Sequence, residues 1–559
     1  MTVEKFYEEW KNLPNLKEEE REALSALSGQ KLEDAFYQEL SFGTAGLRGE
    51  LGVGTNRMNA RVIARATQGL ANTIARRGAE AKARGVVIAW DVRHQSREFM
   101  EVAAGILASN GIKVYVFDDI RPTPMLSFAV RYKGAISGIV ITASHNPKQY
   151  NGYKVYWEEG SQIRDDIAQK ISREIDKLGY ELVDGDFHGY LKAGLIEVMG
   201  EDVDRAYYEA TLAMSASDDV DKDLNIVYTP LNGTGNLPVR KVLKARGFQN
   251  VHVVEEQELP DPDFTTVGYP NPEDPKAFAL AVEYGKNLGA DLLVATDPDS
   301  DRVAMMSPDD EGNFYAYNGN QIGALLIHYI LEVRGEKGDL PENAAMVKSI
   351  VTGELGTAIA REYDIPMFNT LTGFKNICGL ANEWDVTGAH TFLFGYEESI
   401  GYTYGDHVRD KDAVVSTMMI VEMAAYYKKR GQSLYEVLRG IYEKYGYYKE
   451  RLLSVVKEGQ EGQAQIARIM DHVRQAPFTT VGDLAVERVV DYLEGQGAIG
   501  KSNVIEFHLE DGSRFTIRPS GTEPKIKLYI YTVDGDEAVA EEKLGLIEGA
   551  VTQRFEEAL

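Results

Sequence analysis

Short apolar runs alternate with amphipathic segments along most of the chain. The runs Val86–Trp90, Lys113–Phe117 and Gly138–Ile141 predict buried strands, and helical periodicity between the first two predicts a helix at Arg97–Ala108. The same alternation begins again near residue 224 and once more near residue 345. Strands that alternate with helices are typical of parallel or mixed sheets. The pattern therefore predicts an α/β fold with three consecutive, similar mixed-sheet domains.

The two ends of the chain have different patterns. At the start, helical spacing predicts an amphipathic helix with one apolar face, formed by Phe6, Trp10 and Leu13. Near the end, three apolar runs predict the strands of a smaller C-terminal α+β domain, at Val504–Leu509, Arg514–Ile517 and Ile526–Thr532. We expect the domain boundaries to give the ranges 1–205, 206–315, 316–450 and 451–559.

Composition narrows the functional classes. The 559 residues suit three to four domains at roughly 150 residues each. Lys and Arg total 60 against 87 Asp and Glu, and the net charge of −27 argues against a nucleic-acid or anionic-membrane partner. No apolar run is long enough to span a bilayer, and the charged N-terminus does not resemble a secretory signal. The single cysteine, Cys378, excludes a disulfide framework, so we expect a cytoplasmic protein.

Ser144 follows the strand that ends at Thr142, in a loop with the turn dipeptides Asn146–Pro147 and Asn151–Gly152. Ligands collect at such strand ends in α/β sheets. A hydrolase is disfavoured because adjacent side chains diverge in an extended segment, which places His145 poorly as the base for Ser144, and because G-x-S-x-G is absent. The segment alone is typical of a solvated turn, but nearby lysines favour a phosphate on Ser144.

Asp297, Asp299 and Asp301 alternate along a loop that leaves another buried strand. Three converging carboxylates repel one another, and a hard divalent cation relieves that repulsion. An EF-hand is excluded because Arg302 stands where its glycine belongs. The three aspartates thus predict a Mg²⁺ site that leaves positions open for a phosphate oxygen, with an acidic surface turn as the alternative.

Three further segments carry candidate binding groups. Glu397 and Ser399 lie between glycines after a strand and suit sugar hydroxyls, or form a solvated acidic turn. The run from Arg518 to Lys525, RPSGTEPK, suits an anion-binding nest, or a tight hairpin turn. Arg48 lies among closely spaced glycines that permit a close approach to an anion.

The motifs GTAGLRG, TASHNP, DPDSDR, GYEES and RPSGTEPK occur in this order over nearly the whole chain. In this combination the sequence resembles the α-D-phosphohexomutase superfamily, most closely its phosphoglucomutase/phosphopentomutase type. The resemblance implies four domains around a central cleft and an isomerase that interconverts glucose 1-phosphate and glucose 6-phosphate. It implies a phosphoserine at Ser144, with glucose 1,6-bisphosphate as intermediate and activator.

The resemblance also implies roles for individual residues. Mg²⁺ would be bound by Ser144 with its phosphate and by Asp297, Asp299 and Asp301. The catalytic group would comprise Ser144, His145, Arg48, Lys154 and Lys375. The sugar phosphate would contact Arg302, Thr372, Gly373, Glu397, Ser399, Arg518, Ser520, Gly521 and Thr522.

Several alternatives stay open. Some family members have a histidine soon after Glu-x-Ser, whereas Ile400, Gly401 and Tyr402 follow here and the nearest histidine is His407. The substrate could therefore be a pentose or mannose phosphate, or glucose 1,6-bisphosphate could be the product. A non-catalytic sugar-phosphate sensor would lack Ser144 or a metal carboxylate, and neither is missing. The oligomeric state is left open.

Overall fold

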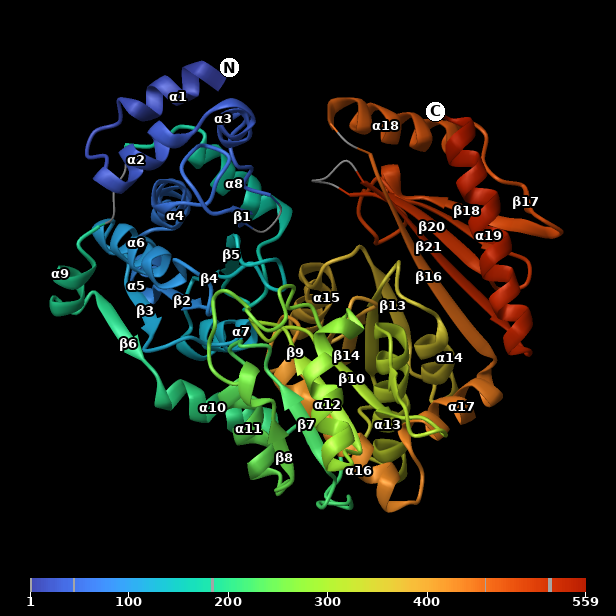
Figure 1. Ribbon diagram of the computed structural model, residues 1–559. Helices are drawn as coiled ribbons and strands as arrows, with labels where there is room; N and C mark the ends of the chain where they lie inside the picture. Colours follow the sequence, from blue (N-terminus) through green and yellow to red (C-terminus); the bar gives the residue numbers. More distant parts are fainter. Residues whose placement is uncertain (1–2, 44–45, 182–184, 458, 521–524) are drawn as a thin grey trace.

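The computed structural model describes residues 3–43, 46–181, 185–457, 459–520 and 525–559. Four sheets follow one another along the chain, and we name the units built on them domains 1 to 4 (Figure 1). The predicted fold class, three consecutive mixed-sheet α/β domains followed by a C-terminal α+β domain, is confirmed.

Domain 1 contains a six-stranded sheet in the order β1-β5-β4-β2-β3-β6. Its strands are β1 (Gly46–Glu50), β2 (Val86–Trp90), β3 (Val114–Phe117), β4 (Ser137–Ile141), β5 (Tyr150–Trp157) and β6 (Ile196–Met199). Its helices are α1 (Val3–Lys11), α2 (Glu18–Ala26), α3 (Gly29–Phe36), α4 (Ala60–Ala75), α5 (Ala79–Arg84), α6 (Ser96–Ser109), α7 (Thr123–Lys133), α8 (Asp165–Ile175), α9 (Phe187–Lys192) and α10 (Glu201–Leu212).

Domains 2 and 3 have smaller sheets, ordered β11-β10-β9-β7-β8 and β13-β12-β14-β15. Domain 2 comprises β7 (Ile226–Thr229), α11 (Asn236–Ala245), β8 (Val251–Val253), α12 (Ala279–Leu288), β9 (Leu292–Thr296), β10 (Val303–Pro308) and β11 (Phe314–Ala316). Domain 3 comprises α13 (Gly319–Lys337), β12 (Ala344–Ser349), α14 (Leu355–Glu362), β13 (Met367–Thr370), α15 (Phe374–Thr387), β14 (Thr391–Glu397), β15 (Gly401–Tyr404), α16 (Ala413–Lys429) and α17 (Leu434–Tyr445).

Domain 4 is an antiparallel sheet ordered β16-β21-β20-β19-β18-β17. It comprises β16 (Tyr447–Val456), α18 (Gly459–Gln475), β17 (Thr480–Val481), β18 (Leu484–Asp491), β19 (Ile505–Leu509), β20 (Arg514–Pro519), β21 (Lys525–Asp534) and α19 (Glu537–Glu557). The three predicted strands correspond to β19, β20 and β21.

The first three sheets share one four-stranded arrangement. It is formed by four successive strands, β2–β5, β7–β10 and β12–β15. In each run the first three strands are parallel, the first lies between the second and the third, and the fourth pairs antiparallel with the third. The matching runs are β5-β4-β2-β3, β10-β9-β7-β8 and β15-β14-β12-β13. Loops that follow the third strand are therefore equivalent in the three domains.

Side-chain caps fix where several helices begin. Asn59 accepts a hydrogen bond from the Val62 backbone at the start of α4. Asn318 and Ser433 form capping boxes at α13 and α17. These residues satisfy backbone N–H groups that the first helical turn leaves without partners.

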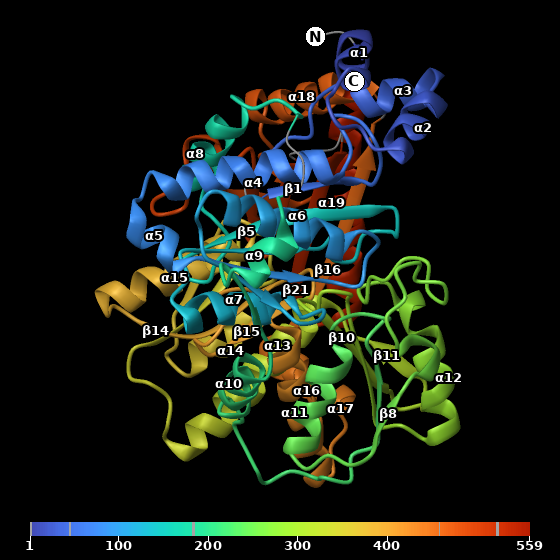
Figure 2. The same ribbon diagram turned by 90° about the vertical axis from the view of Figure 1, so that its left-hand side faces the viewer.

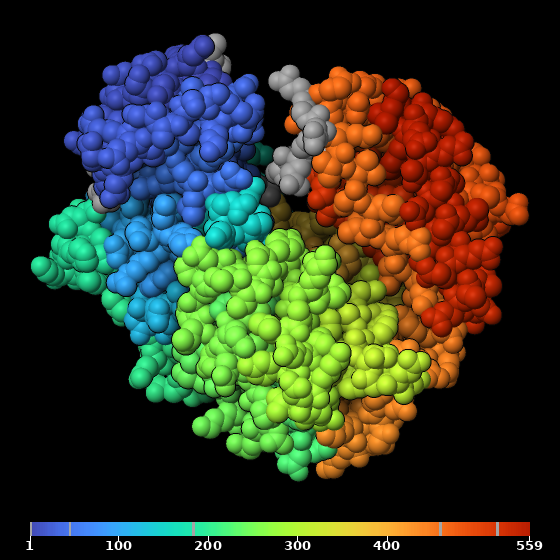
Figure 3. Space-filling view, viewed as in Figure 1, coloured from blue at the N-terminus to red at the C-terminus, as the bar shows by residue number. Residues whose placement is uncertain are grey.

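The apolar helix α16 lies in a core that spans domains 2 and 3, whereas domains 1 and 4 have cores of their own. It contacts strands of both domains and packs against α11 (Figure 2). Its buried surroundings account for its apolar sequence. Within the described part of the chain, no helix is both long and apolar enough to cross a membrane. A space-filling view shows the molecule hollowed between domains 1 and 4 (Figure 3).

Candidate active site

Three chemistry-bearing loops occupy the equivalent position in domains 1, 2 and 3. Ser144 follows β4, the loop Asp297–Asp301 follows β9, and Glu397 ends β14. Each of these strands is the third of the shared four-strand run, and ligands bind at the carboxyl ends of such strands. The repeated fold thus explains why segments far apart in sequence can serve one site.

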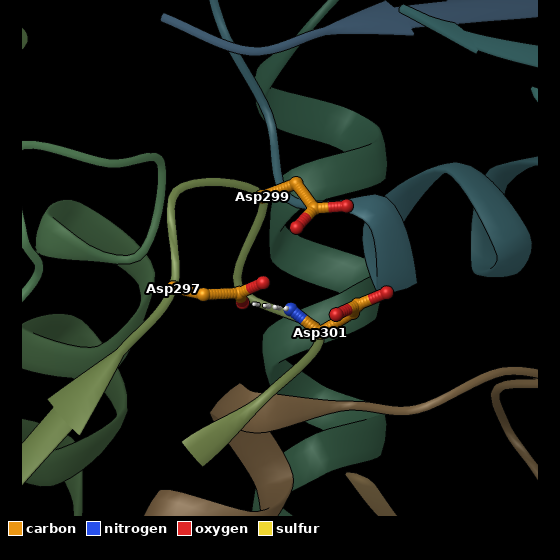
Figure 4. Close-up of side chains that lie close together, drawn as sticks. All are labelled: Asp297, Asp299 and Asp301. Carbon is orange, nitrogen blue, oxygen red and sulfur yellow. Dashed lines mark hydrogen bonds between the residues drawn. The ribbon is translucent and has the colours of Figure 1, made fainter. Parts of the chain in front are cut away.

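The three aspartates converge as predicted. Asp297, Asp299 and Asp301 are almost completely buried, and one carboxylate oxygen from each lies within 4.8 Å of the others (Figure 4). Asp297 Oδ1 accepts hydrogen bonds from the backbone N–H groups of Asp301 at 3.1 Å and Arg302 at 3.0 Å, which closes the loop on itself. The Oδ1 atoms of Asp299 and Asp301 are buried without a hydrogen-bond partner among the described residues.

Two lysines partly balance this charge. Lys154 Nζ lies 3.0 Å from Asp299 Oδ2, and Lys411 Nζ lies 3.1 Å from Asp301 Oδ2. Burial alone would raise the pKa of Asp299, but Lys154 and hydrogen bonds outweigh it and hold that pKa below its usual value. Burial, reinforced by the charges of Asp299 and Asp301, raises the pKa of Asp297 well above its usual value. The site therefore favours additional positive charge.

These residues fit a hard divalent cation. Carboxylate oxygens are the ligands such ions prefer, and two buried oxygens here lack a hydrogen-bond partner within the described ranges. The compact loop brings the donors together without a large rearrangement, since they already lie within 4.8 Å of one another.

Ser144 faces this cluster directly. Its side chain is buried, and its Oγ donates a hydrogen bond to Asp297 Oδ2 at 2.8 Å. The expectation that His145 diverges from Ser144 is wrong, because Nδ1 of His145 lies 3.2 Å from Ser144 Oγ. Ser144 has a φ of 52°, so the chain bends here and is not extended as that expectation assumed. Burial, then the charges of Arg302 and Arg48, lowers the pKa of His145 well below its usual value, so the ring is neutral at neutral pH.

Arg93 holds the Ser144 loop in this shape, a role that the sequence did not reveal beyond its place after a strand. Its guanidinium donates hydrogen bonds to backbone carbonyls along the loop, those of Ser144, Asn146, Pro147 and Tyr150. The buried carboxylate of Asp91 lies close, with its Oδ2 3.4 Å from Arg93 Nε. The guanidinium also lies over the Phe264 ring of domain 2. Arg93 therefore fixes the loop from domain 1 while contacting domain 2.

Comparisons with known proteins agree with this arrangement. The models of the Phosphoglucomutase/phosphomannomutase family, alpha/beta/alpha domains I, II and III and the C-terminal domain, match residues 39–181, 205–312, 318–445 and 454–546. The chain belongs to this family.

Among relatives of this family member, the phosphoglucomutase of Staphylococcus haemolyticus is 39% identical, covering 92% of this chain and 95% of the relative. That of Staphylococcus aureus strain N315 is 38% identical over 89% and 90%. Two solved structures share the fold: pp63/parafusin from Paramecium (TM-score 0.72, 18% identity, coverage 93% and 96%) and a family protein from Burkholderia thailandensis (0.67, 20%, 92% and 97%).

Three of the predicted cations, Arg48, Lys154 and Arg302, lie beside the Ser144 loop or the aspartate cluster. Arg48 on β1 pairs in register with Gly152, two positions from Lys154 on β5, so both side chains project from the same face. Arg48 Nη1 donates to Asn146 Oδ1 at 3.1 Å, beside the Ser144 loop. Arg302 Nη1 donates to the Ser399 carbonyl at 2.9 Å and so joins the loop Asp297–Asp301 to residues 397–399, which we call the sugar loop after its predicted role.

The Thr372–Gly373 turn and the sugar loop also meet. The Gly373 backbone N–H donates to Glu397 Oε1 at 2.7 Å. Lys375 pairs with domain 1, since its Nζ lies 2.6 Å from Asp165 Oδ1. Among the residues described, no recorded contact links Lys375 to Ser144 or to the three aspartates.

Domain 4 gathers positive charge at the predicted phosphate loop. Arg518 on β20 lies opposite Lys527 on β21. Burial, then the charges of Arg518 and Lys525, lowers the pKa of Lys527, so these cations repel one another and suit an anion. Ser520 follows β20, whereas the predicted residues Gly521 and Thr522 lie outside the described residues.

Lys411 contacts the aspartate cluster and is not among the residues predicted from the sequence. Its buried Nζ contacts Asp301 and also Asp410 at 3.0 Å, and the Phe374 ring lies beside it. Burial would lower its pKa, but the two carboxylates outweigh burial and raise it. The available signal was the alternation of charges in Arg409–Asp412, just after the sugar loop.

Proposed function

We propose that the chain interconverts glucose 1-phosphate and glucose 6-phosphate through a phosphoserine at Ser144 and a glucose 1,6-bisphosphate intermediate. The observation that carries this proposal is the 2.8 Å hydrogen bond from Ser144 Oγ to Asp297 within the buried aspartate cluster. The phosphoglucomutases that are 38–39% identical over most of the chain support it.

Mg²⁺ would be held by Asp297, Asp299, Asp301 and a phosphate oxygen on Ser144, and would supply charge neutralisation for the transferring phosphoryl group. Lys154, Arg48 and Arg302 would bind the remaining phosphate oxygens at this end of the site. Positioning and charge stabilisation are the main contributions that a protein makes to phosphoryl transfer.

The phosphoryl group would move from Ser144 Oγ to the free sugar hydroxyl, so one P–O bond breaks and another forms. The bisphosphate would then turn and return its other phosphoryl group to Ser144. His145 Nδ1, which lies 3.2 Å from Ser144 Oγ, would take the serine proton in that return step and would give it back when Ser144 next donates its phosphoryl group. Lys375 would have to leave Asp165 before it could act on a sugar hydroxyl.

The remaining predicted residues would hold the substrate. Glu397, Ser399 and the Thr372–Gly373 turn would contact sugar hydroxyls. Arg518 and Ser520, together with Gly521 and Thr522, would hold the phosphate that is not reacting. Remote binding of this kind can be used to position the reacting end.

Two related activities share the same mechanism: mutation of pentose or mannose phosphates, and synthesis of glucose 1,6-bisphosphate as product. Comparing kcat/KM for glucose, ribose and mannose 1-phosphates separates them. A hundredfold preference for a pentose phosphate would replace glucose phosphate as the substrate.

The mechanism is tested by intact-mass measurement before and after incubation with glucose 1,6-bisphosphate. We expect one phosphate adduct on the wild type, none on Ser144→Ala, and a normal adduct on Ser25→Ala, which removes an exposed hydroxyl of the same domain. An adduct that survives Ser144→Ala would refute the phosphoserine.

A further inference from the structure

Arg514 connects domain 4 to domain 3. It is the first residue of β20 and only 3% exposed, yet its guanidinium reaches out of its own sheet. Nη1 donates to the Ile350 carbonyl at 2.7 Å, and Nη2 donates to the Thr352 carbonyl. Both carbonyls belong to the turn after β12, which we call the 350–354 turn. One side chain thus grips the backbone of another domain at two points.

Acidic partners from both domains keep this guanidinium in place. Glu506 Oε2 of domain 4 lies 3.1 Å from Nη1, and Glu354 Oε1 of domain 3 lies 3.3 Å from Nη2. Burial would lower the pKa of Arg514, but these carboxylates outweigh burial and raise it. Tyr531 lies against the guanidinium, and its hydroxyl donates to the Val351 carbonyl of the same turn.

The interface between domains 3 and 4 is not fully packed beside Arg514. A cavity of about 680 Å³ lies between the two domains, and Arg514, Glu354 and Glu506 are among its lining residues. The apolar contact beside it is small, consisting mainly of Ile350 and Val351 against Tyr492, Val504, Tyr529 and Tyr531. Directional hydrogen bonds from Arg514 therefore contribute to the orientation of domain 4 relative to domain 3. Figure 1 shows this junction where β21 and β16 approach β13 and α14.

The 350–354 turn also supports the sugar loop. Thr352 Oγ1 donates to Glu398 Oε2 at 3.1 Å and accepts from the Glu398 backbone N–H at 3.3 Å. Glu398 stands between Glu397 and Ser399, the residues proposed to hold sugar hydroxyls. At its other end, β20 leads from Arg514 to Arg518 of the phosphate loop.

We propose that Arg514 is a positioning residue that sets the sugar loop and the distal phosphate loop in register with each other. It touches no reacting atom in this arrangement. It acts through Thr352 on the sugar loop and through β20 on Arg518. This inference rests on the proposed function, because it assumes that both loops hold one sugar phosphate. Loss of the grip should weaken substrate binding more than it slows the chemistry at Ser144, which lies in domain 1.

The test is steady-state kinetics of Arg514→Lys. Lysine keeps the positive charge but lacks the two guanidinium nitrogens that donate to two carbonyls at once. We expect KM for glucose 1-phosphate to rise at least tenfold, kcat to change less than threefold, and hydrolysis of the phosphoserine without sugar to keep its rate. Arg488→Lys is the matched control. Arg488 lines the same cavity, but its recorded hydrogen bonds go to His508 of domain 4.

A second variant separates positioning from folding. Thr352→Val removes the link to Glu398 and keeps the carbonyl that Arg514 grips, so it should also raise KM. If both residues act along one path, the double variant should be no worse than the more affected single variant. Fully additive effects, or an unchanged KM in Arg514→Lys, would overturn the inference; if that variant does not fold, an unchanged KM in Thr352→Val would do so. A wild type that forms no phosphoserine would instead refute the proposed function.

Discussion

Replacing Asp299 with Asn should abolish the metal site while leaving the fold intact. The carboxylate contributes one buried oxygen that has no hydrogen-bond partner among the described residues and another that accepts from Lys154 and Thr123. An amide keeps the shape and can still accept from these donors. It cannot supply the negative charge that a divalent cation requires.

The distances give the size of the effect on folding. Ligand atoms within 4.8 Å of one another repel by at least about 3.5 kcal/mol per charged pair at an effective dielectric constant of about 20. Lys154, whose Nζ lies 3.0 Å from Asp299 Oδ2, attracts that carboxylate by about 5.5 kcal/mol at the same dielectric constant. Removing the charge thus removes repulsion and attraction of similar size, whether Asp297 is ionised or protonated. We expect the free energies of unfolding of the metal-free variant and the metal-free wild type to differ by no more than about 2 kcal/mol.

The effect on the metal and the reaction should be much larger. Mg²⁺ at about 100 times its dissociation constant should stabilise the wild type by about 2.7 kcal/mol, seen as a higher melting temperature, and this gain should vanish in Asp299→Asn. Loss of a preorganised electrostatic partner lowers kcat by about 10²–10³-fold. Glu311→Gln, an exposed loss of one charge in the same domain, should change neither quantity. A variant with normal activity and a normal Mg²⁺-dependent rise in melting temperature would refute the assignment of Asp299.

Three further predictions follow from individual contacts. Arg93→Lys cannot satisfy the carbonyls of the Ser144 loop as a guanidinium does, so kcat should fall about tenfold or more with KM unchanged; an unaltered kcat would contradict its role. Burial, then the charge of Glu397, raises the pKa of Glu398 to about 7. Ionisation of Glu398 therefore lowers the free energy of unfolding as pH rises from its unfolded pKa towards 7. Between pH 5 and pH 8, the melting temperature of Glu398→Gln should therefore rise relative to that of the wild type. Parallel pH profiles would exclude this. Lys411→Met leaves Asp301 and Asp410 without their shared buried cation, so denaturant unfolding should show a loss of about 3–5 kcal/mol, and a loss below about 1 kcal/mol would contradict the pairing.

Periodicity predicted the buried strands well because they lie between helices on both faces. Val86–Trp90 is confirmed as β2 with every residue buried, and the helix expected at Arg97–Ala108 is α6. The pattern failed where a strand contains turn-forming residues. Asn151 and Gly152 lie within β5, and Gly152 is required there because a Cβ would lie 2.4 Å from the Thr142 carbonyl oxygen. Half-buried β16 was also missed, and it joins the sheet of domain 4 from Tyr447 onwards.

Residue types and order predicted the aspartate cluster, because DxDxD already concentrates three carboxylates in one short loop. The contacts between domains had no such local signal. The pairing of Lys375 with Asp165 and the approach of Lys411 to Asp301 depend on how separate domains pack. The approach of His145 to Ser144 accompanies a local bend of the chain, the positive φ of Ser144, which periodicity does not reveal.

The charges at the two ends of the site differ in a way that explains how an acidic chain can receive an anion. At the reacting end, four carboxylates (Asp297, Asp299, Asp301 and Asp410) face four cations (Lys154, Lys411, Arg48 and Arg302), so these groups sum to zero when all are ionised. A divalent cation would change that sum to +2. At the distal end, Arg518 and Lys527 already face each other, and burial with like-charge repulsion lowers the pKa of Lys527. An anion relieves this repulsion directly. The distal end therefore offers net positive charge from the protein alone, whereas the reacting end would gain net positive charge together with a cation.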